Sequence, residues 1–303
     1  MNTAEMTAKI AAGHGFIAAL DQSGGSTPKA LAGYGIAEGS YSGDEEMYGL
    51  IHDMRSRIIT APSFTGDKVI AAILFERTMD GTIEGKTAPA ALIERGVVPF
   101  IKIDKGLEAE ANGVQLMKPM PDLDALLARS KALNVFGTKE RSVVNLANRE
   151  GIAAVVAQQF EIGRQVIAGG LMPILEPELN IKSPERAKAE VMLVEELLKA
   201  LDTMPGDDKV MLKLSLPEKA GLYDALVDHP RVLRVVALSG GYARTEACAE
   251  LAKNRGMIAS FSRALLSDLR HQMSDAQFDA ALSAAIDEIY DASVHKVAQP
   301  VVA

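Results

Sequence analysis

The sequence predicts a single α/β domain in which eight parallel strands close into a (β/α)8 barrel. Eight short apolar runs recur along the 303 residues, each run ends in polar residues, and each is followed by a longer amphipathic stretch. Strands that alternate with helical patterns indicate parallel βαβ units, because a parallel connection needs a crossover. Eight such units commonly use about 250 residues as one domain, the TIM-barrel arrangement.

The eight predicted strands are taken in chain order. They lie within residues 15–23, 68–77, 97–106, 133–144, 171–179, 209–218, 232–241 and 257–266. An open doubly wound sheet is the structural alternative, but a glycine-rich dinucleotide loop normally follows its first strand. The turn DQSGGS after the first run lacks that spacing.

Helices are expected between these strands and at the N-terminus. One covers residues 1–12, another residues 154–168, and a third residues 185–201, where Ser183 and Pro184 would serve as cap and first-turn proline. The glycine-rich, polar stretch 32–46 is expected to be a long βα loop. The tail from about residue 293 to residue 303 is expected to be irregular. A single barrel domain is expected to span residues 1–303.

Charge and composition restrict the possible partners. The net charge of -8 argues against a nucleic-acid or anionic-membrane surface, so any bound anion needs local cations. Cys248 is the only cysteine, which excludes an intrachain disulfide, and a buried apolar role is expected for it. The five histidines are scattered, so no metal is expected. The N-terminal residues do not resemble a secretory signal, and no apolar run approaches the roughly 20 residues of a membrane helix, so a cytoplasmic location is expected.

Ionisable residues occur at the ends of the predicted strands. In a barrel, alternate strand residues point inward, and active sites lie at the C-terminal ends of the strands. Any one such residue is explained by emergence into solvent, but their joint occurrence predicts one charged mouth, because buried ions are costly unless paired. The residues are Asp21, Lys102 with Asp104, Lys139 with Arg141, Glu176 with Glu178, and Lys213.

Lys213 is the candidate nucleophile, because its strand is otherwise apolar. A lysine amine that is desolvated and held near other cations has a lowered pKa and can attack ketones, and Lys139 could supply the neighbouring charge. For Lys213 alone, a snorkelling side chain is an equally good explanation. Glu176 and Glu178 would transfer protons, although an exposed strand exit explains them as well.

Two loops suggest phosphate binding. Ser239, Gly240 and Gly241 follow the seventh strand and precede a helix near Ala243, and Arg263 follows the eighth strand. Barrels frequently bind phosphate with these two loops. The segment from Ser23 to Ser26 could cradle another phosphate, or it could be a flexible polar loop.

The ordered motifs ALDQSGGS, FIKIDKG, FGTKERS, PILEPEL, MLKLSLPE, ALSGG and SFSRAL resemble class I fructose-1,6-bisphosphate aldolase, particularly its shorter bacterial branch. The resemblance runs from about Gly15 to Leu266. It implies the reversible, metal-independent cleavage of fructose 1,6-bisphosphate to dihydroxyacetone phosphate and glyceraldehyde 3-phosphate, in glycolysis and gluconeogenesis. The covalent Schiff base would serve in place of a cofactor, and a homo-oligomer is possible.

The resemblance also implies roles for individual residues. Lys213 would form the Schiff base, Glu176 would be its acid and base, and Glu178 would be hydrogen-bonded to Glu176. Asp21 would take the proton of the C4 hydroxyl, and Lys139 would position groups and lower the pKa of the reactive amine. The implied substrate-binding residues are Ser23, Ser26, Lys102, Arg141, Ser239, Gly240, Gly241 and Arg263.

Three positions depart from the family pattern. Gln22 stands where animal and plant enzymes usually carry Glu, Ala30 stands where Arg is common, and the chain ends in PVVA without the terminal Tyr of animal enzymes. Tyr290 lies in a helical pattern and is not expected to replace that Tyr. Two alternatives stay open: another lysine-dependent barrel aldolase, such as a transaldolase-like enzyme, and a catalytically silent sugar-phosphate-binding barrel.

Overall fold

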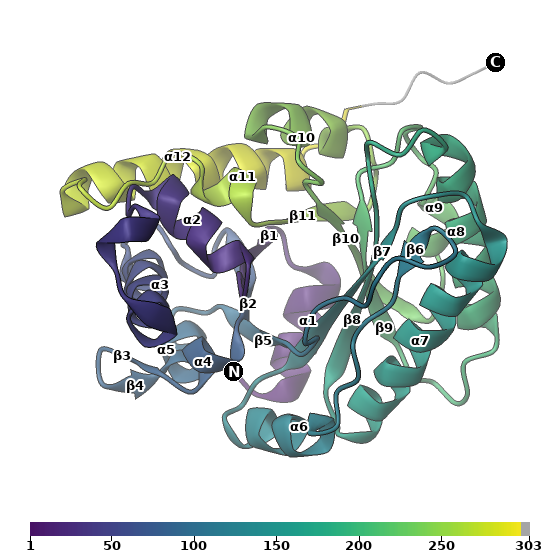
Figure 1. Ribbon diagram of the computed structural model, residues 1–303, viewed down its shortest axis with the longest axis horizontal. Helices are drawn as coiled ribbons and strands as arrows, with labels where there is room; N and C mark the ends of the chain where they lie inside the picture. Colours follow the sequence, from purple (N-terminus) through teal and green to yellow (C-terminus); the bar gives the residue numbers. More distant parts are fainter. Residues whose placement is uncertain (298–303) are drawn as a thin grey trace.

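A computed structural model describes residues 1–297 of the chain. Its main sheet has nine strands in the order β5-β2-β1-β11-β10-β9-β8-β7-β6 and closes through an additional pairing of β5 with β7. Every neighbouring pair in this circle is parallel, and only β6 is antiparallel to its neighbour, β7. The (β/α)8 barrel is therefore confirmed, and the open doubly wound sheet is wrong because the first and last barrel strands pair (Figure 1).

Each barrel strand lies within one of the eight runs expected from the sequence. The strands are β1 (Phe16–Leu20), β2 (Val69–Leu74), β5 (Val98–Lys102), β7 (Gly137–Val144), β8 (Met172–Leu179), β9 (Val210–Ser215), β10 (Val232–Leu238) and β11 (Met257–Phe261). Three short strands lie outside the parallel barrel: β3 (Thr82–Ile83), β4 (Lys86–Thr87) and β6 (Val114–Gln115).

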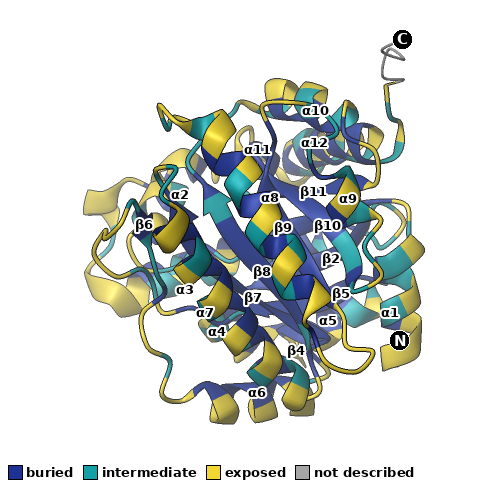
Figure 2. Cartoon of the chain, turned by 90° about the vertical axis from the view of Figure 1, so that its right-hand side faces the viewer, coloured by how far each residue is buried: buried dark blue, intermediate teal, exposed yellow. Residues whose placement is uncertain are grey.

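Helices lie around the barrel, over its outer face and at its N-terminal end. They are α1 (Thr3–Ala12), α2 (Ser26–Tyr34), α3 (Gly43–Thr60), α4 (Glu76–Met79), α5 (Ala88–Glu94), α6 (Leu123–Ala132), α7 (Arg149–Ala168), α8 (Arg186–Asp202), α9 (Asp224–Val227), α10 (Arg244–Ala252), α11 (Arg263–Leu266) and α12 (Asp275–Val294). Figure 2 shows their exposed faces turned outward and the buried strands beneath them.

The expectation of a long loop over residues 32–46 is wrong. The stretch contains the end of α2, a 3-10 turn (Glu38–Ser40) and the start of α3. Gly35, with a φ of 94°, ends α2, and the acidic residues in the first turn of α3 favour its positive N-terminal dipole. The glycines that end α2 and begin α3 were therefore interpreted as loop residues.

Two further boundaries differ from expectation. The helix expected from Glu185 begins at Arg186, and the Ser183 hydroxyl accepts a hydrogen bond from the Glu185 backbone (3.2 Å) before the helix starts. Residues 293 and 294 of the expected irregular tail belong to α12. Residues 295–297 are irregular, as expected, and the tail from residue 298 onward lies outside the described residues. The expected N-terminal helix is present as α1.

The N-terminal end of the barrel is closed by α1. Its buried Met6 and Ile10 join the apolar cluster that fills the barrel interior, which includes Ile17, Phe100 and Ile174. The Lys9 ammonium donates to the Gly66 carbonyl (2.8 Å), and Arg234 of β10 donates to the Ala11 carbonyl (2.7 Å). Apolar packing thus occupies one end of the barrel.

The inward face of several strands changes from apolar to ionisable toward the C-terminal end. In β8, Ile174 belongs to the interior cluster and Glu176 follows two residues later, while in β9 Met211 is followed by Lys213. Because side chains alternate along a strand, residues two apart share one face. The charged groups therefore lie at the C-terminal mouth, where sequence analysis expects the site.

Candidate active site

Lys139 is the central cation of the mouth. Its Nζ lies 2.7 Å from Oδ2 of Asp21, 3.0 Å from Oε2 of Glu176 and 3.9 Å from Oδ2 of Asp104. Burial lowers the pKa of this ammonium, but the surrounding carboxylates outweigh burial and raise the pKa well above its usual value. Lys139 is therefore a permanently charged group that joins β1, β5 and β8 through β7.

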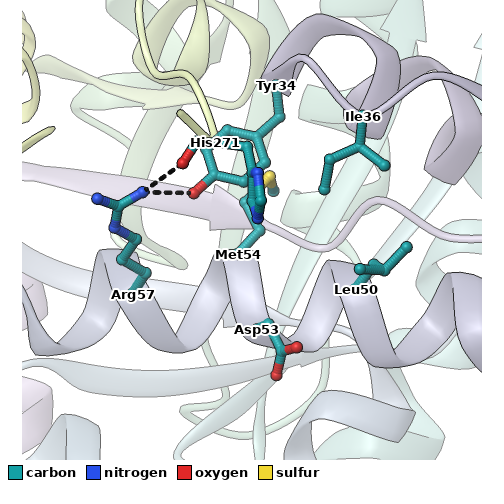
Figure 3. A pocket seen from close by; sticks show the side chains of 7 residues that line it. All are labelled: Tyr34, Ile36, Leu50, Asp53, Met54, Arg57 and His271. Atoms are coloured by element: carbon teal, nitrogen blue, oxygen red, sulfur yellow. Dashed lines mark hydrogen bonds between the residues drawn. The ribbon is translucent and has the colours of Figure 1, made fainter. Parts of the chain in front are cut away.

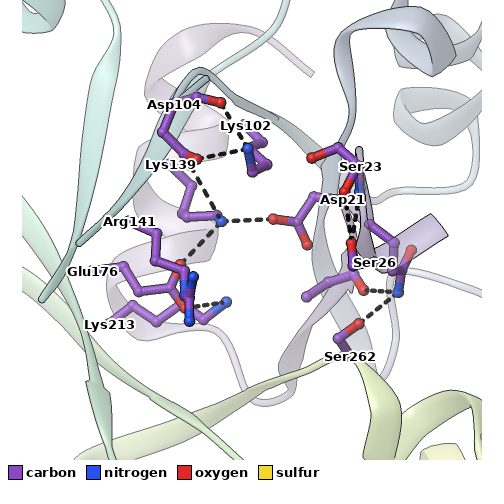
Figure 4. A network of polar contacts seen from close by, with 12 residues as sticks. Asp21, Ser23, Ser26, Lys102, Asp104, Lys139, Arg141, Glu176, Lys213 and Ser262 are labelled. Carbon is purple, nitrogen blue, oxygen red and sulfur yellow. Dashed lines mark hydrogen bonds and ion pairs between the residues drawn. The ribbon is translucent and has the colours of Figure 1, made fainter. Parts of the chain in front are cut away.

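Lys213 lies on the other side of the same glutamate. Its Nζ is 3.0 Å from Oε1 of Glu176, and the lysine is only 4% exposed, so its amine is shielded from bulk water. The order Asp21, Lys139, Glu176, Lys213 alternates carboxylate and ammonium across the mouth (Figure 4). The expectation that Lys213 is a solvent-pointing, snorkelling lysine does not fit this burial.

Glu176 is held by its backbone as well as by the lysines. Its amide donates to Oε1 of Gln159 in α7 (3.2 Å), and the Gln159 amide nitrogen donates to the Ser142 hydroxyl (2.7 Å). Burial raises the pKa of the Glu176 carboxyl, but Lys139 and Lys213 outweigh this effect, and the pKa lies below its usual value. Glu176 is therefore ionised and able to accept a proton at neutral pH.

Asp21 follows β1 directly and faces the same lysines. Burial raises the pKa of its carboxyl, but Lys139, Lys213 and Lys102 lower it more strongly, so the pKa falls well below its usual range. The resulting carboxylate is held in the basic form. A group in this form can accept a proton from a substrate hydroxyl.

Two more ion pairs line the mouth. The Arg141 Nε donates to the Glu178 carboxylate, and the Lys102 ammonium lies 2.7 Å from Oδ1 of Asp104. Glu178 was expected to be the hydrogen-bonded partner of Glu176, but its carboxylate is instead paired with Arg141. In the register of β7 with β8, Arg141 lies opposite Glu176. Its long side chain extends along β8 to Glu178, two residues further on.

The loops after β10 and β11 meet where a phosphate site was expected. Gly240 and Gly241 have φ values of 60° and 115°, and a Cβ on Gly241 would lie 3.9 Å from Nη2 of Arg263. The Arg263 guanidinium therefore lies beside a glycine backbone that is open to a ligand. Ser239, which precedes these glycines, is 7% exposed, and α10 begins just after Ala243, as expected.

The segment after β1 forms a compact turn. The Ser26 hydroxyl donates to the Ser23 carbonyl and accepts from the Ser23 amide, both at 2.9 Å. These contacts order the segment that was expected to be either a phosphate cradle or a flexible loop. Ser26 opens α2 and is exposed, while Ser23 is half-buried beside the charged network (Figure 4).

A separate cavity of about 140 Å³ lies between α2, α3 and the segment that precedes α12 (Figure 3). Arg57 crosses one side and donates to the Tyr34 hydroxyl (3.2 Å) and to the His271 carbonyl (3.1 Å). The same guanidinium also pairs with Asp275 (3.0 Å). Because these bonds join α3 to the C-terminal segment, Arg57 fastens the outer helices to each other.

The single cysteine of the chain lies outside the mouth, in α10. Cys248 is buried in α10, and burial raises the pKa of its thiol to about 12. Within residues 1–297, no group of three or more His, Cys, Asp or Glu side chains is arranged to hold a metal ion. In the same part of the chain, no helix has the length and apolar character needed to cross a bilayer.

Several functional-site residues were missed by sequence reasoning. Asp104 was recognised only as a member of a period-2 pair, although it contacts both Lys102 and Lys139. Arg55 is fully buried in α3, and it lies on the face that also carries Ile51 and Ile59. An arginine at helical spacing from buried apolar residues was the available signal. Gln22 was singled out only as a departure from the family pattern, and Ser262, to which its amide nitrogen donates, gave no comparable signal.

Comparisons with known proteins agree with this geometry. The family model for class-I fructose-bisphosphate aldolase, a glycolytic family, matches residues 2–220. The fructose-bisphosphate aldolase of Plasmodium falciparum, solved with TRAP and a small-molecule inhibitor, has a TM-score of 0.78 at 18% identity, over 98% of this chain and 95% of that chain. The Cgl0159 protein of Corynebacterium glutamicum has a TM-score of 0.53 at 12% identity, over 96% and 92% of the two chains. These structural similarities support the fold, and the family match over most of the chain shows that it belongs to the class-I fructose-bisphosphate aldolases, which are lyases.

Proposed function

We propose that Lys213 forms the Schiff base through which this aldolase cleaves fructose 1,6-bisphosphate to dihydroxyacetone phosphate and glyceraldehyde 3-phosphate. The observation that carries the assignment is the buried alternation of Asp21, Lys139, Glu176 and Lys213. Binding a sugar phosphate requires no such set of proton-transfer groups. A catalytic barrel therefore explains the mouth better than a silent binding barrel.

Glu176 serves the steps at the amine. As a carboxylate 3.0 Å from Lys213, it accepts a proton from the ammonium and leaves a neutral amine that attacks the substrate C2 carbonyl. The protonated glutamate then donates to the C2 hydroxyl of the carbinolamine, and water leaves as the iminium forms. Lys139 holds the other glutamate oxygen, which keeps the carboxyl oriented during both transfers.

Asp21 serves the carbon–carbon cleavage. Its carboxylate accepts the proton of the C4 hydroxyl, the C3–C4 bond breaks, and its electron pair moves into the iminium to give an enamine. Glyceraldehyde 3-phosphate is the aldehyde released. Asp21 then releases the proton that it accepted, C3 of the enamine takes up one proton, and water hydrolyses the resulting iminium to return dihydroxyacetone phosphate and free Lys213. These steps require no metal, because the protonated imine is the electron acceptor.

The two phosphates are assigned to opposite sides of the mouth. Ser239, Gly240, Gly241 and Arg263 hold the phosphate of the dihydroxyacetone half, as the approach of Arg263 to Gly241 supports. Lys102, Arg141, Ser23 and Ser26 face the other half. Asp104 and Glu178 orient the two cations of this group before substrate arrives.

Borohydride trapping with dihydroxyacetone phosphate tests the assignment. We expect mass spectrometry to find one reduced adduct, on Lys213, and we expect both trapping and cleavage to survive EDTA. Lys213→Met should abolish the adduct, while Lys105→Met, at an exposed lysine, should retain it. Labelling on another lysine would contradict the assignment of the nucleophile.

Comparison of two substrates separates this aldolase from a transaldolase-like alternative with a single-phosphate substrate. Faster cleavage of fructose 1,6-bisphosphate than of fructose 1-phosphate is expected if Lys102 and Arg141 bind a second phosphate. We further propose a cytoplasmic setting, which the glycolytic description of the family supports. Homo-oligomer formation stays a prediction that sedimentation of the purified protein can measure.

A further inference from the structure

Arg55, which is fully buried in α3, joins two segments at the barrel mouth, one after β1 and one after β2. Its Nη1 donates to the Thr78 hydroxyl in α4, which follows β2 (2.7 Å). Its Nη2 donates to the backbone carbonyl of Gln22, after β1, and to Oε1 of the same glutamine (3.2 Å). The guanidinium thereby fixes both the backbone and the side chain of the residue next to Asp21.

The contacts of the Gln22 amide allow only one orientation. An arginine carries hydrogen-bond donors only, so the atom that faces Arg55 must be the amide oxygen. The amide nitrogen then faces the Ala19 carbonyl (3.3 Å), which can only accept, and the Ser262 hydroxyl (2.5 Å). Both amide hydrogens are therefore used, and the Ser262 oxygen must be the acceptor of its bond with Gln22.

This direction leaves the Ser262 proton free to point elsewhere. A hydroxyl has one proton and two lone pairs, and Gln22 occupies a lone pair. Within the described part of the chain, no protein oxygen accepts the Ser262 proton. Ser262 directly precedes Arg263, whose guanidinium lies beside Gly241, and Figure 4 shows Ser262 at the edge of the mouth.

We propose that the Ser262 hydroxyl donates a hydrogen bond to the phosphate of the dihydroxyacetone half of the substrate, beside Arg263. Gln22 and Arg55 are positioning residues in this scheme, because they act by turning the Ser262 proton toward the ligand. The inference rests on the proposed function, since it assumes that this phosphate lies between Arg263 and the Ser239–Gly241 loop.

Trapping with two ketones, one with and one without phosphate, tests the hydroxyl. We expect Ser262→Ala to raise the concentration of dihydroxyacetone phosphate needed for half-maximal adduct about tenfold, the loss typical of one hydrogen bond to a charged group. Unphosphorylated dihydroxyacetone should form the adduct as in the wild type. Ser283→Ala, which removes another half-buried serine hydroxyl in α12, is the matched control and should leave both values unchanged.

A second variant tests whether Gln22 orients the Ser262 hydroxyl. In Gln22→Glu, a carboxylate oxygen replaces the amide nitrogen and accepts the Ser262 proton, so the hydroxyl turns away from the mouth. We expect Gln22→Glu alone to weaken trapping by dihydroxyacetone phosphate several-fold. In the Ser262→Ala background, the same substitution should cause little further loss, and a double-mutant cycle measures the difference.

Three outcomes separate the possibilities. An equal loss for both ketones in Ser262→Ala would show a structural role and overturn the phosphate contact. Unchanged trapping by Ser262→Ala, with normal wild-type trapping on Lys213, would overturn it as well and leave the proposed function intact. Failure of the wild-type protein to form an adduct on Lys213 would overturn the proposed function, and the inference with it.

Discussion

Lys139 and Glu140 are consecutive residues of β7 with opposite surroundings. Lys139 faces the barrel mouth and its carboxylates, whereas Glu140 is fully buried, and neither of its oxygens has a hydrogen-bond partner among residues 1–297. Burial raises the pKa of the Glu140 carboxyl well above its usual value, and the nearby Asp104 raises it further. A permanently charged cation and a neutral acid therefore occupy neighbouring positions.

This raised pKa predicts a pH-dependent stability. A carboxyl whose folded pKa exceeds its unfolded pKa contributes stability that is present at low pH and lost as pH rises through the folded pKa. Above about pH 5, the unfolding free energy of the wild type should therefore fall relative to that of Glu140→Gln, by up to about 1.4 kcal/mol per pH unit. Urea unfolding of both proteins from pH 5 to 9 measures this difference. A constant difference across that range would contradict the assignment.

The sequence was informative about residues of the mouth and poor about their partners. Asp21, Lys139, Glu176 and Lys213 could be predicted because strand periodicity places them on one inward face. The partner of Glu178 could not be predicted by the same rule, because residues two apart on a strand are about 7 Å apart, whereas a long side chain on the adjacent strand reaches further. The helical spacing of Arg55 from Ile51 and Ile59 indicated its burial, but its partners Gln22 and Thr78 depend on how α3 packs against the barrel.

At the scale of elements, β7 begins at a glycine that has no room for a side chain. A Cβ on Gly137 would lie 2.2 Å from the Met172 carbonyl oxygen of β8 and 2.6 Å from the Phe100 ring. Gly49, in contrast, lies exposed in the middle of α3, and nothing is within 4 Å of its Cβ position. The same substitution should therefore have opposite effects at the two positions.

Gly137→Ala should destabilise the barrel by about 3 kcal/mol or more, because backbone atoms must move apart. Gly49→Ala should stabilise the protein by up to about 1 kcal/mol, because alanine favours the helical backbone. Thermal unfolding followed by circular dichroism measures both changes. A Tm for Gly137→Ala at or above that of the wild type would be inconsistent with the strand geometry.

The elements themselves were largely predictable. All eight barrel strands lie within the short runs read from the sequence, and β1, β2, β9 and β11 are buried along their whole length. Residues 32–46 misled the prediction because glycines that end or precede helices resemble loop glycines in sequence. The start of α8 shows that Ser183 and Pro184 form a turn before the helix, a distinction that depends on backbone angles.

At the scale of the whole molecule, the two ends of the barrel have different tasks. The C-terminal mouth carries the charged groups, while α1 closes the opposite end with Met6 and Ile10. Stability and catalysis should therefore respond separately to changes at the N-terminal end. The closed circle of strands connects the ends without placing any residue of α1 in the mouth.

Ile10→Ala tests this separation. Removing this fully buried side chain should cost about 2–5 kcal/mol of unfolding free energy, because it leaves a cavity in the barrel interior. The kcat for fructose 1,6-bisphosphate, measured well below the unfolding temperature, should stay within about twofold of the wild type. Thr7→Ala, on the same helix but outside the buried pair, is the control. A kcat that falls in parallel with stability would show that the two ends are coupled.

The different surroundings of Lys139 and Glu140 also disfavour a shift in the register of β7. If this strand slipped by one position against its neighbours, the ammonium of Lys139 would enter the apolar layer under the helices, and the acid of Glu140 would enter the mouth beside Asp21, Asp104 and Glu176. Both changes would be unfavourable at once. Lys139 and Glu140 together therefore specify the register of β7 in the closed barrel.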